Sequence, residues 1–205
     1  PVTTAPSPHP AGTTPQAADT AAIAKAQRDS ARLPYTEADI RFMSGMISHH
    51  AQAILMAGWA LENSTNPSVR TLAGRIINAQ QDEIALMQGW LRDRRQPVPE
   101  ASPHGMRMTM NGMEHHMRMP GMLDEAELKR LQAARGADFD VLFVRSMIRH
   151  HEGAVRMVRE LFGTPGAGQD DVVFKFASDV HVDQATEIER MRRMLVALTF
   201  ENPSP

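Results

Sequence analysis

The stretch DIRFMSGMISHHAQAILM at residues 39–56 recurs 101 residues later as DVLFVRSMIRHHEGAVRM at residues 140–157. Both copies space their apolar residues three or four apart, which is the period of an amphipathic helix. A second match, at an offset of 104, pairs the Gln-x-x-Glu-Ile segment at residues 80–84 with the one at residues 184–188. The chain is therefore interpreted as two copies of a helical hairpin.

A single helical hairpin cannot bury its own apolar face, whereas two can pack together as a four-helix bundle. The pattern predicts an all-α domain over residues 34–200, with hairpins at about 36–94 and 138–200. Thr36 and Asp39 form a capping pair at the start of the first helix, and Asn66-Pro67 starts the second. Residues 1–33, rich in Pro, Thr and Ala, are expected to form a flexible leader.

Composition excludes several classes of function. The 205 residues include 22 Lys and Arg, 24 Asp and Glu and no Cys, so the formal charge is −2 and there is no basic surface for nucleic acid. The absence of Cys rules out disulfides and thiolate zinc sites. No apolar run is long enough to span a membrane. A chain that opens with proline is interpreted as mature, without its signal peptide, and hence as secreted, periplasmic or part of the cell envelope.

The paired histidines are the first candidates for chemistry. His49, His50, His150 and His151 all continue apolar stripes of their helices. Burying four imidazoles needs four polar partners unless they share a metal ion, and neutral imidazole is a common metal ligand. The alternative is that each His is a hydrogen-bonded core residue. Met46 and Met147 lie one turn earlier, where they either fill the core or add a thioether to the site.

The second helix of each hairpin carries a carboxylate on its apolar stripe. Glu83 and Glu187 interrupt runs of buried residue types. Carboxylates are seldom buried unpaired, so they either orient the histidines or bind the metal directly. A third interpretation, equally open, places both at the edge of the stripe and in contact with solvent.

An insert at residues 95–123 holds seven of the 15 Met and three of the nine His. Its Pro and Gly residues predict no regular element, so it should be mobile until a metal orders it. Clustered thioethers and imidazoles without Cys favour Cu(I) or Ag(I). A packed apolar flap is the competing interpretation. The candidate ligands here are His104, Met106, Met108, Met110, Met113, His115, His116, Met117 and Met119, with Met122 at the end of the cluster.

The doubled Met-x-x-His-His-x-x-Ala segment at 46–53 and 147–154, with Phe139-Asp140 and the two Gln-x-x-Glu-Ile segments, resembles the secreted bacterial "domain of unknown function 305" family. The resemblance covers about residues 35–200. It implies a ferritin-like four-helix bundle, a periplasmic or extracellular location, and metal binding at the paired histidines. Some relatives are linked to copper binding and copper resistance. The leader and the Met-rich insert lie outside the common pattern.

Two functions from different classes follow. The first is a Cu(I) or Ag(I) sequestration or transfer protein, with a metal ion and a metallochaperone or efflux component as partners. The second is a ferritin-like oxidase with two iron or manganese ions. Di-metal bundles use Glu-x-x-His motifs and four carboxylates, whereas only two carboxylates are available here, so binding is favoured over catalysis. A helical interaction module with structural histidines is a third alternative. The sequence predicts no oligomeric state.

Overall fold

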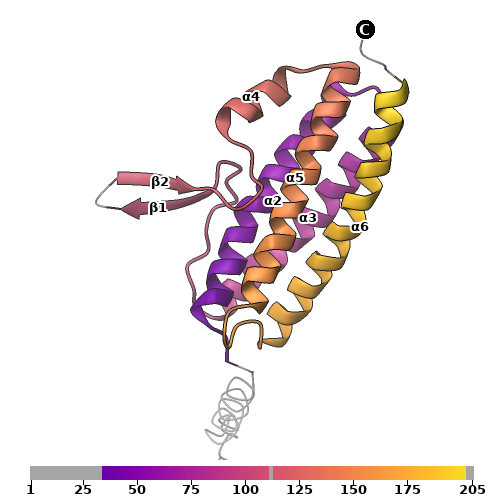
Figure 1. Cartoon of the computed structure of the whole chain (residues 1–205). Coiled ribbons are helices and arrows are strands. Elements are labelled where there is room, and N and C mark those ends of the chain that lie inside the picture. Colours follow the sequence, from indigo (N-terminus) through magenta and orange to yellow (C-terminus); the bar gives the residue numbers. More distant parts are fainter. Residues whose placement is uncertain (1–33, 111–112, 202–205) are drawn as a thin grey trace, which may run out of the picture. The chain divides into compact units, whose positions relative to one another are not determined.

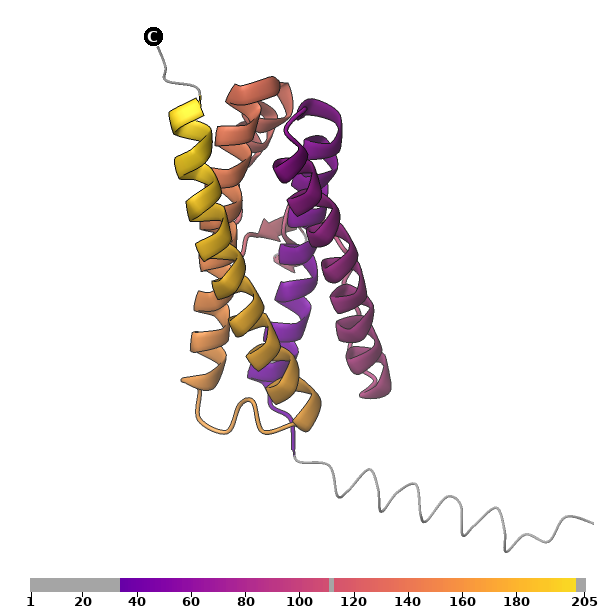
Figure 2. The ribbon, with the colours of Figure 1, turned by 90° about the vertical axis from the view of Figure 1, so that its right-hand side faces the viewer.

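The computed structural model describes residues 34–110 and 113–201. Four long helices form a bundle: α2 (Glu37–Asn63), α3 (Pro67–Asp93), α5 (Gly136–Phe162) and α6 (Asp171–Glu201). α2 packs along α3, α5 packs along α6, and the two hairpins meet where α2 contacts α5 (Figures 1 and 2). The predicted all-α four-helix bundle is confirmed. The leader expected at residues 1–33 lies outside the described residues.

Side chains at the helix starts fix the ends of the first hairpin. The Thr36 hydroxyl accepts the amide of Asp39, whose carboxylate in turn accepts the amide of Thr36, so the predicted capping pair is present. Asn66 caps α3, with Pro67 in its first turn. The buried Asp39 also accepts the amide of Gly168 at 2.7 Å, which ties the loop before α6 to the start of α2.

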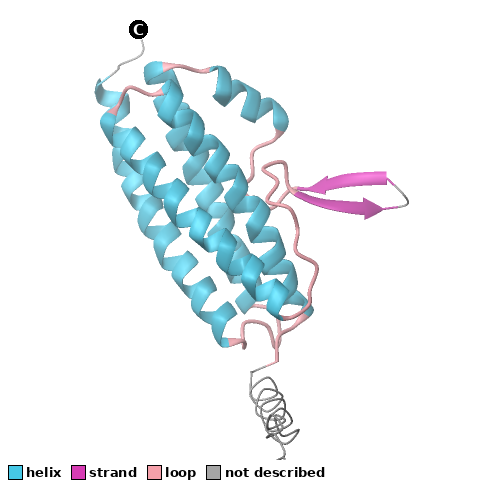
Figure 3. Cartoon of the chain, turned by 180° about the vertical axis from the view of Figure 1, so that it is seen from behind, coloured by secondary structure: helices cyan, strands magenta, loops and turns pink. Residues whose placement is uncertain are grey.

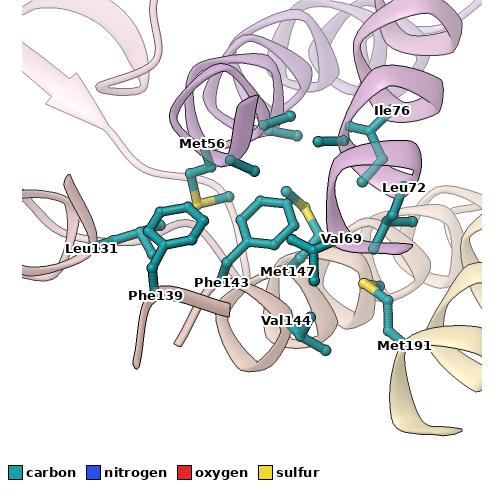
Figure 4. Packing of buried hydrophobic residues seen from close by; sticks show 14 of the residues in the cluster. Met56, Val69, Leu72, Ile76, Leu131, Phe139, Phe143, Val144, Met147 and Met191 are labelled. Carbon is teal, nitrogen blue, oxygen red and sulfur yellow. The ribbon is translucent and has the colours of Figure 1, made fainter. Parts of the chain in front are cut away.

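The apolar core is divided into two clusters, because each helix interrupts its apolar stripe near its middle. Figure 4 shows part of one cluster, in which Met56 of α2 lies beside Phe139 and Phe143 of α5. The other cluster contains Phe42 and Met46 of α2. Polar side chains lie along each helix between the residues of the two clusters: His49 and His50, Gln80 and Glu83, His150 and His151, and Gln184 and Glu187. We call these eight residues the polar layer.

The insert is more regular than the sequence predicts. β1 (Met106–Met110) and β2 (Met113–Met117) form an antiparallel hairpin that projects from one side of the bundle (Figure 3). The expectation of no regular element is therefore wrong. The overlooked signal is Asn111-Gly112, a pair that favours two-residue hairpin turns, between two stretches of equal length. Those two residues themselves lie outside the described part.

A short helix, α4 (Glu125–Ala133), follows the insert. The Asp124 carboxylate caps it by accepting the amide of Glu127, and the Glu127 carboxylate in turn accepts the amide of Asp124. Leu128 and Leu131 pack this helix against the apolar cluster that contains Met56 and Phe143. None of the helices in the described ranges has the length and apolar character required to cross a membrane.

Candidate metal site

All four predicted histidines lie in the polar layer, and at most 1% of the surface of each is exposed. α2 and α5 cross at their midpoints, so His49 and His150 meet face to face. Their ring centroids are 3.8 Å apart, and the ring planes are inclined by 37°. Each neighbouring ring, His50 or His151, lies 6.3 Å from its partner in the pair. The structure therefore brings the two His pairs together, a point that the sequence leaves open.

The two carboxylates hold the outer pair of imidazoles. Glu83 Oε2 lies 2.5 Å from Nε2 of His50, and Glu187 Oε2 lies 2.8 Å from Nε2 of His151. With the proton on Nε2, each imidazole donates a hydrogen bond to its carboxylate, and the lone pair on Nδ1 is not used in that bond. Neither Nδ1 atom has a hydrogen-bond partner. Both glutamates thus orient histidines, and about a fifth of each side chain remains exposed.

The inner pair is electrically neutral. Burial, together with the nearby His50 and against the opposing effect of the Pro120 carbonyl, lowers the pKa of His49 to about 3. Burial, and then His49, likewise place the pKa of His150 well below its ordinary value. A neutral imidazole keeps a lone pair on one ring nitrogen, which is the state that binds metals.

Several ring nitrogens in the layer have no hydrogen-bond partner. His49 donates from Nε2 to the Pro120 carbonyl at 3.0 Å, but its Nδ1 is unpaired, and His150 has no partner on either nitrogen. A buried polar atom left unpaired costs about 1–3 kcal/mol. Such atoms in a native structure call for a ligand or a water. The neutral, unpaired nitrogens fit a soft or borderline metal ion.

The insert closes one side of the layer through residues 119–122, which we call the strap. Pro120 and Gly121 lie directly on α5: a Cβ on Gly153 would be 2.7 Å from the Cα of Gly121 and closer still to the Pro120 carbonyl. Gly121 has a φ of +81°, which favours glycine. On α2, a Cβ on Gly45 would be 2.8 Å from the Sδ of Met119. The strap therefore rests on glycines of both helices.

Gln52 anchors the insert beside the strap. Its amide donates to the carbonyls of Pro103 and Leu123, and its oxygen accepts the Leu123 amide at 2.6 Å. Sequence reasoning missed Gly45, Gln52 and Gly153. The two copies differ at these positions, where Gly45 corresponds to Ser146 and Gln52 corresponds to Gly153. Eight other aligned positions differ as well, so the difference alone does not single these residues out.

Thioethers gather at the base of the hairpin. Met106 and Met117 pair across β1 and β2, and with Met119 and Met157 they line a pocket of about 290 Å³. Met157 was not among the predicted ligands. Met46 and Met147 are both fully buried, but they belong to different apolar clusters. Because α2 and α5 are antiparallel, these two residues lie on opposite sides of the polar layer.

The insert histidines lie apart from that pocket. His104 and His116 line a separate pocket of about 590 Å³ with Asp124 and Glu125, and His115 is exposed. The side chains of Met108, Met110 and Met113 lie outside the described part. In residues 34–110 and 113–201, no three His, Asp or Glu side chains are grouped closely enough to hold one ion. The structure thus presents pairs of ligand-competent groups and no complete shell of these residue types.

Known proteins of similar sequence and fold identify the family of this chain. The family model described as "Domain of unknown function (DUF305)" matches residues 39–195. The chain belongs to the DUF305 family. A DUF305 protein from Streptomyces coelicolor has a similar crystal structure, with 29% identity and a TM-score of 0.66 over 78% of this chain and 93% of that one.

A second similar structure is that of CopM. Its Cu(II)-bound form is 32% identical to this chain, with a TM-score of 0.60 over 78% of this chain and 96% of CopM. CopM has also been solved with Cu(I), with silver and without metal. An uncharacterized protein of Acanthamoeba polyphaga mimivirus is 39% identical over 57 residues, which span 28% of this chain and 38% of the viral protein.

Proposed function

We propose that this DUF305 protein binds Cu(I), and Ag(I) in its place, and sequesters or transfers it. The observation that carries the proposal is the facing pair His49 and His150, whose rings are buried, neutral and supplied with unpaired nitrogens. Solved structures of CopM with Cu(I) and silver support the choice of metal. Imidazole and thioether donors suit these ions better than iron or zinc.

The strap connects the buried histidines with the thioethers at the base of the hairpin. The Pro120 carbonyl accepts a hydrogen bond from His49. The neighbouring Met119 lies against Gly45 of α2 and lines the thioether pocket. A metal held by thioethers at the base of the hairpin would therefore lie along the same segment that covers the histidines. The exposed His115 and Met117 place further donors on the outside, where a metallochaperone or an efflux component would exchange metal.

Binding is proposed in preference to an oxidase reaction. Di-iron bundles hold their ions with four carboxylates, two of them in Glu-x-x-His motifs. In the described part of the polar layer the carboxylates are Glu83 and Glu187, and each is hydrogen bonded to a histidine of its own hairpin. This arrangement favours ordered imidazoles over a carboxylate-bridged iron pair. An extracytoplasmic location is part of the proposal, supported by the Streptomyces relative described as a candidate secreted protein.

A Cu(I) competition titration against a chromophoric chelator under reducing conditions tests this function. The variant His49→Ala/His50→Ala/His150→Ala/His151→Ala should lose the tightest copper binding. A matched control is His181→Ala, on α6 outside the layer. Unchanged copper affinity in the quadruple variant would contradict the proposal, as would preferential loading of two irons with consumption of oxygen. Circular dichroism establishes that each variant keeps its helices.

A further inference from the structure

α3 and α6 border a second polar pocket, which the copper proposal does not use. It has a volume of about 230 Å³ and is lined from these two helices alone. The insert, by contrast, contacts the bundle through α2 and α5. Five side chains with a carboxylate or amide group line the pocket: Gln80, Glu83, Asp183, Gln184 and Glu187. We call this group the oxygen cluster.

Two members of the oxygen cluster are buried acceptors without a donor. Gln80 and Gln184 are 2% and 4% exposed, and the Oε1 atom of each has no hydrogen-bond partner. They occupy equivalent positions in the two hairpins, one helical turn before Glu83 and Glu187. An unpaired buried carbonyl oxygen is costly, so its repetition in both hairpins indicates a shared ligand that supplies positive charge or a donor.

The carboxylates of the cluster repel one another. Although Asp183 is partly exposed, desolvation at the pocket raises its pKa, and the neighbouring Glu83, Asp179 and Glu187 also raise it. A cation placed among these groups would relieve that repulsion. The pocket also contains Arg75 and Arg190, and Nη1 of Arg190 is buried without a hydrogen-bond partner. Arg75 precedes Glu83 by eight residues, a rise of about 12 Å along α3. Arg190 lies one turn after Glu187 but seven residues, about 10 Å, after Asp183, so the acidic end of the pocket is the one near Asp183.

We propose that the oxygen cluster binds a hard divalent cation, with Ca²⁺ as the ion that fits it best. Carboxylates, side-chain carbonyls and water are the ligands that Ca²⁺ prefers. No three carboxylates in the described ranges converge on one point, so the ion retains part of its water. A water needs about 10–15 Å³ of volume of this kind, so the pocket of about 230 Å³ has room for an ion with several waters.

This cation site is chemically separate from the copper site. The oxygen cluster offers hard donors, whereas the four histidines of the polar layer and the methionines at the hairpin base offer imidazole nitrogen and thioether sulfur. The two sites meet at Glu83 and Glu187, since one oxygen of each carboxylate is bonded to a histidine. The inference does not depend on copper, because Ca²⁺ binding is measured on the copper-free chain.

Isothermal titration of the copper-free chain with Ca²⁺ alone tests the proposal. We expect one site with a dissociation constant of about 0.1–1 mM, the range of extracellular calcium modules. Asp183→Asn should weaken binding about tenfold, because ligand charge sets calcium affinity. Arg75→Gln should strengthen it. Glu125→Gln is the matched control: it also removes one carboxylate charge, from an exposed residue on α4, and should leave the affinity unchanged.

A second variant tests the carbonyl oxygens. Gln80→Leu/Gln184→Leu removes both unpaired acceptors at similar volume and should also weaken Ca²⁺ binding. If this double variant does not fold, Asp183→Asn still decides, because the Asp183 side chain is exposed and its replacement is tolerated. No Ca²⁺ binding at millimolar concentrations, or equal losses in Asp183→Asn and Glu125→Gln, would overturn the proposal. Copper affinity that is retained in Asp183→Asn would leave the proposed function intact.

Discussion

His49 and His150, which are 101 residues apart in the chain, stack ring to ring at the centre of the bundle with centroids 3.8 Å apart. Burial makes a charge on either ring unfavourable, and a charge on His49 would lower the pKa of His150 further. The fold therefore holds two uncharged imidazoles against each other, and this has measurable consequences.

The stability of the metal-free protein should fall as the pH drops below about 6.5. The unfolded chain binds protons at His49 and His150 with an ordinary pKa of 6.5, whereas the folded pKa of His49 is about 3. Protonation therefore favours the unfolded state between those values. The free energy of unfolding should decrease by up to about 1.4 kcal/mol per pH unit for each histidine. Urea denaturation at several pH values measures this slope.

The double variant His49→Gln/His150→Gln provides the comparison for that slope. Glutamine does not titrate, so the variant's stability should depend much less on pH over the same range. If the variant keeps the full slope of the parent chain, other groups cause the acid sensitivity and the assignment to the stacked histidines is wrong.

The strap depends on the missing side chain of Gly153. Gly153→Ala would place a Cβ against Pro120 and Gly121, so the strap or the helix must move. We expect a loss of about 1–3 kcal/mol in the free energy of unfolding, as for other overpacked sites. Gly58→Ala is the matched control, because nothing lies within 4 Å of its Cβ position. That change should stabilise α2 by about 0.5–1 kcal/mol. Equal effects of the two substitutions would show that the strap does not press on α5.

The glutamates should act through the histidines that they hold. Glu83→Ala leaves the buried Nε2 of His50 without its acceptor, which should destabilise the fold by about 1–3 kcal/mol. Loss of such an orienting group should also weaken metal binding about 10–100-fold. Glu83→Gln retains an acceptor oxygen and should recover most of the stability. Denaturation and copper titration of both variants separate the two effects; the same copper affinity in Glu83→Ala and the parent chain would count against an orienting role.

The thioethers at the hairpin base should contribute to copper binding without stabilising the fold. Replacement of Met106, Met117, Met119 and Met157 by Leu keeps apolar volume and removes sulfur, so the cost to stability should be below about 1.5 kcal/mol per site. The number of Cu(I) ions bound should decrease. A control variant, Met87→Leu, changes a buried methionine that does not line the pocket. Unchanged copper capacity in the fourfold variant would identify the pocket as packing alone.

Much of this arrangement can be predicted from the sequence, because it follows from local periodicity and from the repeat. The spacing of apolar residues predicts the four long helices, and the matched His-His and Gln-x-x-Glu segments predict which residues share the central layer. Capping at Thr36 and Asn66 could also be anticipated, since both use contacts within one turn.

The position of the insert could not be predicted in the same way. The insert can lie against the helices because Gly153 and Gly45 have no side chain. It is also held by hydrogen bonds from Gln52 to backbone carbonyls more than 50 residues away. None of these has a period or a motif. The opposite placement of Met46 and Met147 follows from the antiparallel packing of α2 and α5, which brings equivalent residues of the two copies to opposite sides of the layer.

X-ray absorption at the copper edge of the Cu(I)-loaded chain identifies the atoms bound to the metal. We expect imidazole nitrogen together with thioether sulfur as ligands, and loss of the imidazole signal in His49→Ala/His150→Ala. Oxygen ligands alone, or a spectrum that this double variant leaves unchanged, would contradict copper binding at the stacked histidines.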